Sequence, residues 1–412
     1  MTIDEIVKET LGRWADEARV PGGLADRALA RRRRGRVRTF AVIAGATAAV
    51  VAAAVVVAPA VLPRRGDDTR IALAGNSLIV DGPAVALPQS GELSADSDAA
   101  PPTKLVATPE AAMYAYYVWD YEQLPDKRQR YRQTWYLYNP ATATYEKTPW
   151  AVVDVADGGY VAVLEEQHAR RVGVLGPDRQ VKWVDLPHPA SSVKWSPDGG
   201  KLLLTSYSAN PHGQLEMSGT VVVHRSPATR TGFSVVDVKS GQVSFRPLTS
   251  VDGDLGANLW LYWSQDGSLI WETQSTPPST KRFYDLEGRP RPAPPHVAET
   301  YQEAGLSPSG RSLMVDSPDQ SAIVAVKDVA SGTTTPLRPL AGHWIEQSVA
   351  WSGEDKVIVW ACELEGTNNC RVSEFRNRLL LVDADGGQAV PLTGYMANSQ
   401  EPGAWVPLFA RR

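Results

Sequence analysis

The chain has 412 residues, of which 43% are hydrophobic and 21% are charged. This length and composition predict one large folded domain or two to three smaller ones, with enough apolar residues for a substantial core. The net charge of −4 argues against a nucleic-acid-binding protein, so nucleic acid is not expected among the partners.

Residues 1–39 are expected to form a short basic head on the cytoplasmic side of a membrane. They contain ten basic and six acidic residues, a net charge of +4, whereas the whole chain carries −4. Apolar residues recur at three- and four-residue steps within 2–18, which predicts an amphipathic helix capped by Thr2. Its apolar face is a candidate site for a cytoplasmic regulator and consists of Ile3, Val7, Leu11 and Trp14. The alternative is a helix that only assists membrane insertion.

Residues 40–62 are predicted to form a transmembrane helix. The segment has no charged residue, and at about 1.5 Å per residue it is long enough to cross a hydrocarbon core of about 30 Å. The basic run at 31–38, RRRRGRVR, predicts a cytoplasmic N-terminus and an extracytoplasmic remainder. A cleavable signal peptide is the alternative, because Ala58-Pro59-Ala60 has the form of a cleavage site. The long region before the span favours an uncleaved, single-pass anchor.

Residues 63–110 are expected to form a stalk or linker, in which 71–87 has the pattern of a possible strand. The string at 90–103, SGELSADSDAAPPT, is rich in Ser, Asp, Ala and Pro and is expected to be flexible. Residues 111–412 have the pattern of strands throughout and are expected to form one repeating all-β domain.

A repeated string is the strongest signal in this region. It occurs at 193–206, 261–274, 304–317 and 349–362, each time as an apolar run, a Trp or Leu, a Ser, a polar turn and a second apolar run. Where the turn reads Ser-Pro-Asp-Gly, Pro presets φ, Asp offers an acceptor and Gly tolerates positive φ, so a β-hairpin is predicted. The repeated core and turn residues are Trp195, Asp198, Gly199, Trp263, Asp266, Gly267, Leu306, Gly310 and Trp351.

A second hairpin closes each repeat, at 233–248, 323–337 and 379–392. The steps from Trp263 to Leu306 and from there to Trp351 are 43 and 45 residues. Four strands in such a repeat are typical of a β-propeller blade. Weaker units at 114–150 and 151–186 bring the expected number of blades to six, or seven if 71–87 contributes strands. An insertion at 208–220 accounts for the longer first step, and 404–410 is expected to supply a closing strand.

Trp195-Ser-Pro-Asp-Gly199 and its looser copies resemble the repeat of TolB-like and WD-repeat-like β-propellers. The layout of basic head, Ala/Val-rich span and propeller resembles membrane-anchored proteins of actinobacterial type. This resemblance implies the fold and is nearly silent about function, because propellers have many unrelated functions. The head resembles the cytoplasmic part of anti-sigma-factor-like membrane proteins, although it lacks the His/Cys metal motif that some of them carry.

Cys362 and Cys370 are the only cysteines. In an oxidising compartment they are expected to form one disulfide, and two free thiols are the alternative. The sequence predicts no catalytic, cofactor-binding or metal-ligating residues, because the six histidines are scattered and no phosphate-binding loop occurs.

The sequence therefore predicts a membrane-anchored, extracytoplasmic β-propeller that is a non-catalytic binding module. A protein or envelope ligand is expected on the propeller face or in its central channel. One alternative is a sensor or anti-sigma-like regulator whose head binds a cytoplasmic transcription regulator. A propeller enzyme is a further alternative, disfavoured because no converging set of carboxylates and histidines is evident.

Overall fold

The computed structural model describes residues 77–412 except 88–90, 125–128, 212–213, 219–220, 226–228, 249–259, 274–280, 296, 298–302, 318–322, 338–341, 365–369, 371–375, 398 and 400. The chain divides into two compact units, 1–52 and 53–412. The predicted head, its face of Ile3, Val7, Leu11 and Trp14, and the predicted span at 40–62 all lie outside the described residues. Within the described part, no helix is long and apolar enough to span a membrane.

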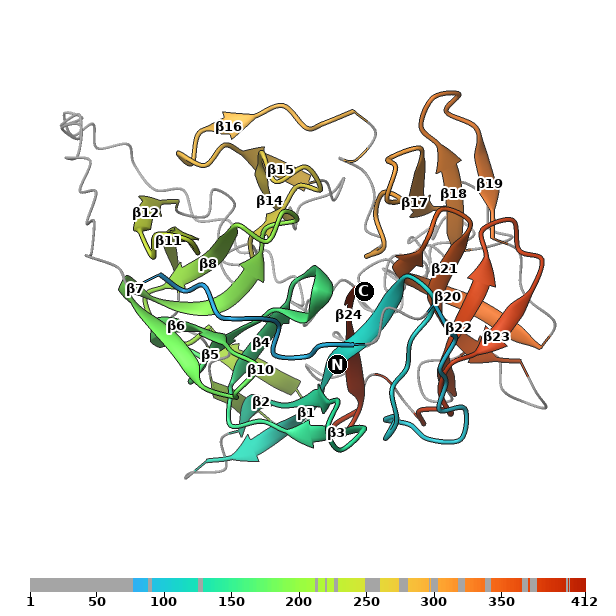
Figure 1. Ribbon diagram of the computed structural model, residues 1–412, viewed down its shortest axis with the longest axis horizontal. Coiled ribbons are helices and arrows are strands. Elements are labelled where there is room, and N and C mark those ends of the chain that lie inside the picture. The colour runs from blue at the N-terminus through green and yellow to red at the C-terminus, as the bar shows by residue number, and fades with distance from the viewer. Residues whose placement is uncertain are drawn as a thin grey trace, which may run out of the picture. The chain divides into compact units, whose positions relative to one another are not determined.

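The described strands form antiparallel sheets (Figure 1). One sheet contains β1 (Ala111–Gln123), β2 (Gln129–Asn139), β3 (Thr144–Lys147), β9 (Gln214–Ser218), β10 (Val221–Arg225) and β24 (Trp405–Arg411). A second contains β4 (Val152–Val155), β5 (Val161–Leu164), β6 (Ala169–Leu175), β7 (Val181–Trp195), β8 (Lys201–Tyr207), β11 (Arg230–Asp237) and β12 (Val243–Pro247). A short 3₁₀ helix, Asp157–Gly159, lies between β4 and β5.

Three further sheets follow in chain order. The first contains β13 (Tyr262–Trp263), β14 (Ile270–Thr273), β15 (Lys281–Tyr284) and β16 (Pro290–Arg291). The second contains β17 (Ser312–Asp316), β18 (Val324–Asp328) and β19 (Thr334–Pro336). The third contains β20 (His343–Ser352), β21 (Lys356–Glu363), β22 (Asn377–Asp383) and β23 (Ala389–Pro391). In each of them, strands that are consecutive in the sequence are neighbours.

The middle strands are apolar on both faces because sheets pack against each other on both sides. All four residues of β5 are buried, and Leu202, Leu203 and Leu204 of β8 are fully buried in succession. Leu202 and Leu204 belong to one hydrophobic cluster, whereas Leu203 belongs to another. Alternate residues of one strand thus pack against different neighbouring sheets, as expected in a propeller.

The seven-stranded sheet consists of two successive meanders that share β7. The first part of β7 pairs with β6, from Val181 opposite Leu175 to Asp185 opposite Arg171. The last part pairs with β8, from Ser192 opposite Thr205 to Trp195 opposite Leu202. The fold is therefore all-β and propeller-like, which confirms that part of the predicted fold class, whereas the number of blades, the transmembrane helix and the helical head stay predictions.

The first and last strands of the domain are paired. β24 lies antiparallel to β1, from Ala111 opposite Arg411 to Val118 opposite Trp405. Trp405 is 1% exposed and packs against the indole of Trp360 in β21, with ring centroids 5.0 Å apart. The last strand thus joins the first sheet and contacts the last one.

The residues before β1 pack against the sheets. Residues 77–87, which we name the strap, bury Leu78 and Val85 completely. Further on, Val106 and Thr108 are also fully buried, and Ser94 and Ala107 form an isolated bridge. The segment expected to be flexible at 90–103 is tied to the domain through Ser94 and Asp96, although seven of its thirteen described residues are exposed. Polar groups of this segment are hydrogen-bonded locally, because the Asp96 carboxylate accepts hydrogen bonds from the N–H groups of Thr103 and Lys104.

Candidate functional site

The two ends of the strands differ in the length of the connections they carry. At one end, which we name the turn face, the connections between first and second and between third and fourth strands have at most six residues. At the other end, the loop face, the connections between second and third strands include longer ones. The second-to-third connections span 124–128, 165–168, 208–229, 274–280, 317–323 and 364–376, and the last four of these have seven residues or more.

The Ser-Pro-Asp-Gly turn at 196–199 and its copy Ser-Gln-Asp-Gly at 264–267 lie on the turn face. The Asp198 carboxylate accepts the Ser196 hydroxyl and the Gly200 N–H, and Gly199 has φ +67°. Asp266 accepts the Ser264 hydroxyl in the same way, and Gly267 has φ +69°. Hydrogen bonds from the serine hydroxyls, followed by backbone or further hydroxyl donors, lower the pKa of both carboxyl groups. These side chains build turns.

The third copy of this turn is completed by a neighbouring repeat. Leu306 stands in place of Trp, Ser309 in place of Asp, and Gly310 has φ +74°. The Glu354 carboxylate from the next repeat accepts the Ser309 N–H at 2.7 Å and the Ser307 hydroxyl at 3.0 Å. A carboxylate from another sheet therefore takes the role of the missing aspartate.

The repeated tryptophans connect consecutive repeats. Trp195, Trp263 and Trp351 are each less than a tenth exposed. The indole N–H of Trp263 donates to the Lys194 carbonyl, and that of Trp351 donates to the Gly305 carbonyl, both at 3.0 Å. The Trp195 indole nitrogen is buried without a hydrogen-bond partner. These contacts favour a packing role for the tryptophans over a ligand-binding aromatic ring.

Cys362 and Cys370 form a disulfide on the loop face, with Cα atoms 5.8 Å apart. Beside it, the guanidinium groups of Arg376 and Arg378 lie 4.5 and 4.4 Å from the ring centroid of Tyr395. The Tyr395 hydroxyl is 2.9 Å from Nε2 of His343. The disulfide ties Cys370, in the middle of the 364–376 connection, to β21, and the cation–π contact of Arg376 holds the last residue of that connection.

A buried polar cluster joins the loop-face ends of β11 and β14 to Tyr284, the last residue of β15. Arg230 is 1% exposed and forms an ion pair with Glu272, whose other carboxylate oxygen accepts the Tyr284 hydroxyl. Arg230 Nε also donates to the Leu248 carbonyl. Burial, and then the hydrogen bond to Glu272, raise the pKa of Tyr284 to about 12. Sequence reasoning missed this cluster, because 42 residues separate Arg230 from Glu272.

The predicted insertion at 208–220 contributes to a hairpin that reaches another sheet. β9 and β10 pair with each other, and β9 also pairs with β2 through Leu215 opposite Gln129 and Gln214 opposite Arg130. The insertion thus links the sheet of β8 to the sheet of β1 at the loop face. No sequence pattern indicated this contact.

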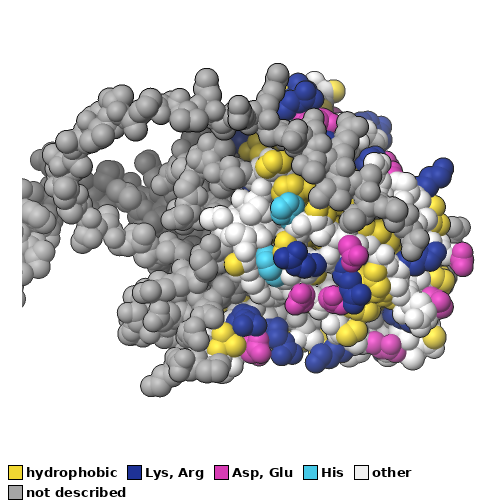
Figure 2. Space-filling model, turned by 90° about the vertical axis from the view of Figure 1, so that its left-hand side faces the viewer, with side chains coloured by type: hydrophobic (Ala, Val, Ile, Leu, Met, Phe, Trp, Pro, Cys, Tyr) yellow, Lys and Arg dark blue, Asp and Glu magenta, His cyan; other side chains and the backbone are white. Residues whose placement is uncertain are grey.

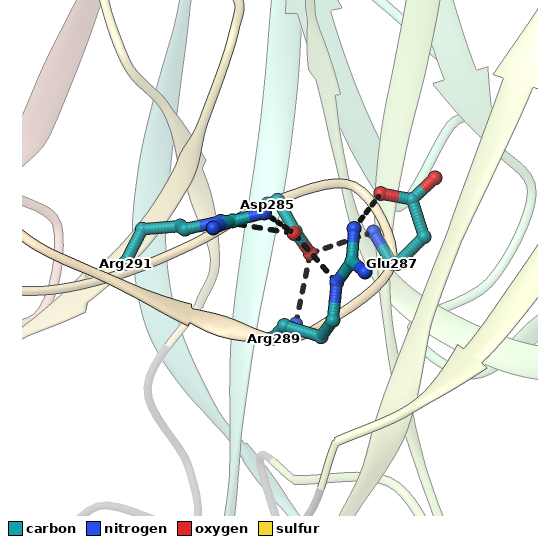
Figure 3. A network of polar contacts seen from close by, with 4 residues as sticks. All are labelled: Asp285, Glu287, Arg289 and Arg291. Carbon is teal, nitrogen blue, oxygen red and sulfur yellow. Dashed lines mark hydrogen bonds and ion pairs between the residues drawn. The ribbon is translucent and has the colours of Figure 1, made fainter.

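The described surface mixes both signs of charge. Figure 2 shows basic and acidic side chains interspersed over one side of the molecule. On the turn face, Asp285 accepts hydrogen bonds from the guanidinium groups of Arg289 and Arg291 (Figure 3). Burial acts to raise the pKa of Asp285, but the backbone N–H and guanidinium group of Arg289 outweigh it and lower that pKa. The arginines therefore brace the hairpin between β15 and β16.

Among the residues that the structure describes, no group of three or more His, Cys, Asp or Glu side chains is placed to hold a metal ion. The polar clusters of the loop face are instead joined by ion pairs, hydrogen bonds and cation–π contacts. Arg376, Tyr395 and His343 are at least partly exposed and can contact a ligand through hydrogen bonds and aromatic contacts, whereas the pair of Arg230 and Glu272 is buried.

No protein-family model and no curated protein matches this sequence. Solved structures similar to it include a protein assigned as TolB from Agrobacterium tumefaciens, at 15% identity and TM-score 0.36, over 65% of this chain and 92% of that one. Hydrazine synthase from Kuenenia stuttgartiensis has 14% identity and TM-score 0.34, over 59% and 65% of the two chains. Acylaminoacyl peptidase from Pyrococcus horikoshii has 13% identity and TM-score 0.39, over 73% of this chain and 47% of that one. This chain thus spans about half the length of the peptidase.

Proposed function

We propose that this protein is a membrane-anchored, extracytoplasmic β-propeller of six blades that binds a protein or envelope ligand on its loop face and performs no catalysis. The observation that carries the proposal is the difference between the two faces. Short, self-capped turns and the strap occupy the turn face, whereas the longer connections and the polar clusters lie on the loop face. Function in propellers is concentrated where loops from several blades converge.

Contacts between successive meanders support six blades. The blades begin at β24, β4, the end of β7, β13, Leu306 and β20. Asp154 of the second blade bonds Lys194 and the Trp195 N–H of the third, and Glu354 links the fifth and sixth. Pairing of β24 with β1 then closes the ring between the last blade and the first.

The position of the strap supports the assignment of the loop face as the binding face. Leu78 N–H donates to the Val238 carbonyl, and Val85 N–H donates to the Gly159 carbonyl. Both carbonyls belong to turn-face connections, so the strap lies on the turn face and not on the loop face. The disulfide between Cys362 and Cys370 is compatible with export to an oxidising compartment.

Site-specific photo-crosslinking of the full-length protein in its own membranes tests the binding proposal. A photoreactive residue replaces Arg376 on the loop face or, as the matched control, Lys239 on the turn face, since both positions are exposed. The proposal predicts a discrete adduct with an envelope component from position 376 and none from position 239. Adducts from neither position, or equal adducts from both, contradict loop-face binding.

A further inference from the structure

The sheet that begins with β13 has two unlike sides. Ile270 and Trp271 follow each other in β14, so their side chains point to opposite sides of the sheet. Ile270 is fully buried in a hydrophobic cluster with Leu203 and Phe233 of the preceding sheet. Trp271 stays partly exposed and belongs to no hydrophobic cluster in the described part of the chain. An apolar core therefore closes one side of this sheet, whereas the other side keeps part of its surface in contact with solvent.

Trp271 is the middle member of a row of three side chains. On the strand to one side, the ring of Tyr262 stacks on the indole, with centroids 4.7 Å apart and planes 23° apart. On the strand to the other side, Nζ of Lys281 lies 4.2 Å from the indole centroid. The indole N–H donates to the Trp263 carbonyl at 2.9 Å, which fixes the ring. All three members of the row are partly exposed.

This row lies at the loop face, beside the next sheet. Lys281 is the first residue of β15 and directly follows the connection at 274–280. Asp316 is the last residue of β17, also at the loop face. The charge of Asp316 acts on the Lys281 ammonium, so these two strand ends lie near each other. We name Tyr262, Trp271 and Lys281 the seam site, because they lie at the boundary between the two sheets.

The Lys281 ammonium is incompletely satisfied. Lys194 forms an ion pair with Asp154, whereas Lys281 forms no hydrogen bond or ion pair with any residue that the structure describes. Burial lowers the pKa of Lys281 to about 8, and the charge of Asp316 acts in the opposite direction. The Trp271 ring contacts the ammonium but leaves N–H donors without an acceptor. An anionic group that accepts hydrogen bonds from them stabilises the charged form.

We propose that the seam site binds the carboxylate of an acidic sugar in an envelope glycan. Lys281 donates charge-assisted hydrogen bonds to the carboxylate, and the apolar face of the sugar ring packs against Tyr262 and Trp271. One ammonium matches the one carboxylate of a uronic acid unit. An acidic peptide supplies the charge without a rigid ring for the aromatic pair, so the glycan is favoured. This inference rests on the proposed ligand binding at the loop face and names the class of ligand.

Calorimetric titration of the detergent-purified, full-length protein tests the inference with three probes. They are a galacturonic acid trimer, a neutral galactose trimer and a triglutamate peptide of the same charge as the first. The galacturonate trimer is expected to bind tightest. Lys281→Met removes the charge and keeps the apolar stem, and it is expected to weaken binding of this trimer about tenfold. Lys239→Met is the matched control, because Lys239 is exposed on the turn face, and its affinity is expected to be unchanged.

The charge of Lys281 supplies a second readout. Lys281→Met is expected to retain the melting temperature of the wild type, because it removes a charge that has no acceptor among the described residues. Isotope-labelled methyl groups on the lysines report the pKa of Lys281 by NMR. Saturation with the galacturonate trimer is expected to raise this pKa, because a bound carboxylate favours the ammonium form. An unchanged pKa at saturation overturns the proposal.

The affinities of the three probes decide between the possible ligands. Equal affinity for the galacturonate and galactose trimers, tighter binding of triglutamate, or unchanged binding in Lys281→Met overturns the acidic-sugar assignment. The proposed function fails separately. A photo-adduct from position 376 without galacturonate binding retains loop-face binding and overturns only this assignment.

Discussion

The indole N–H of Trp263 donates a 3.0 Å hydrogen bond to the carbonyl of Lys194, the residue that precedes Trp195 in the previous repeat. Trp351 makes the same contact with Gly305, which precedes Leu306. The tryptophan of one repeat thus donates a hydrogen bond to the backbone of the repeat before it, at an equivalent position in both cases. The tryptophan that recurs in the sequence repeat therefore connects one sheet to the next.

Replacing Trp263 by Phe is expected to destabilise the protein by about 0.5–1.5 kcal/mol, because the part-buried hydrogen bond to the Lys194 carbonyl is lost. Trp195→Phe is the matched control, since the Trp195 indole nitrogen has no hydrogen-bond partner to lose. Denaturant unfolding of both variants measures the difference in free energy. An equal loss of stability in the two variants would show that the hydrogen bond contributes nothing.

Glu354→Gln is expected to make the stability of the protein less sensitive to acidic pH. Hydrogen bonds from the Ser309 hydroxyl, and then from the Ser309 N–H and the Ser307 hydroxyl, lower the pKa of Glu354 from its ordinary 4.5. A lowered pKa means that this contribution to stability is complete above pH 4.5 and is lost as the pH falls through the folded value.

Thermal unfolding across acidic pH measures this effect, with Asp355→Asn as the control at the adjacent residue. The melting temperature of the Gln variant is expected to fall less steeply below pH 4.5 than that of the wild type. Identical pH profiles for the wild type and Glu354→Gln would contradict the role of Glu354 in the turn of the neighbouring blade.

Gly159→Ala is expected to release the strap. A Cβ at this position would lie 2.0 Å from the Val85 carbonyl oxygen, which is closer than any real contact. Gly158→Ala is the control, because Gly158 also has positive φ, +76°, yet a Cβ there meets nothing within 4 Å. Both variants carry backbone strain, and only the first displaces the strap.

Hydrogen exchange distinguishes these two glycine variants. The amides of Leu78 and Val85 are bonded to the Val238 and Gly159 carbonyls and are expected to be protected in the wild type. Their protection should be lost in Gly159→Ala and retained in Gly158→Ala. Retained protection in both variants would mean that the strap does not depend on its contact with Gly159.

Replacing Cys362 and Cys370 by Ser is expected to lower stability by about 2–3 kcal/mol, because the disulfide closes a short loop. A reductant should lower the melting temperature of the wild type and leave that of the double variant unchanged. An unchanged wild-type melting temperature after complete reduction, verified by thiol counting, would contradict a stabilising role.

The sequence was most informative where structure is local. The repeated turn at 196–200 depends on neighbouring residues, so its serine, aspartate and glycine indicated a hairpin before any contact was known. The apolar run at Leu202–Leu204 indicated a strand for the same reason.

Contacts between residues that are far apart in the sequence could not be predicted in this way. Glu354 completes a turn 45 residues earlier, and nothing near Ser309 indicates it. The contacts of the segment before β1 were missed because its polar composition is typical of a linker, whereas Leu78, Val85 and Val106 are fully buried. Arg230 and Glu272 meet only because two sheets pack together.

Thiol labelling in intact cells tests the central claim, an anchored module outside the cytoplasm, most directly. One cysteine is introduced at Lys8 in the head or at Gln388, an exposed turn residue. A membrane-impermeant maleimide is expected to label Gln388→Cys in intact cells and Lys8→Cys only after permeabilisation. Labelling of Gln388→Cys only after permeabilisation would place the propeller in the cytoplasm and contradict the account.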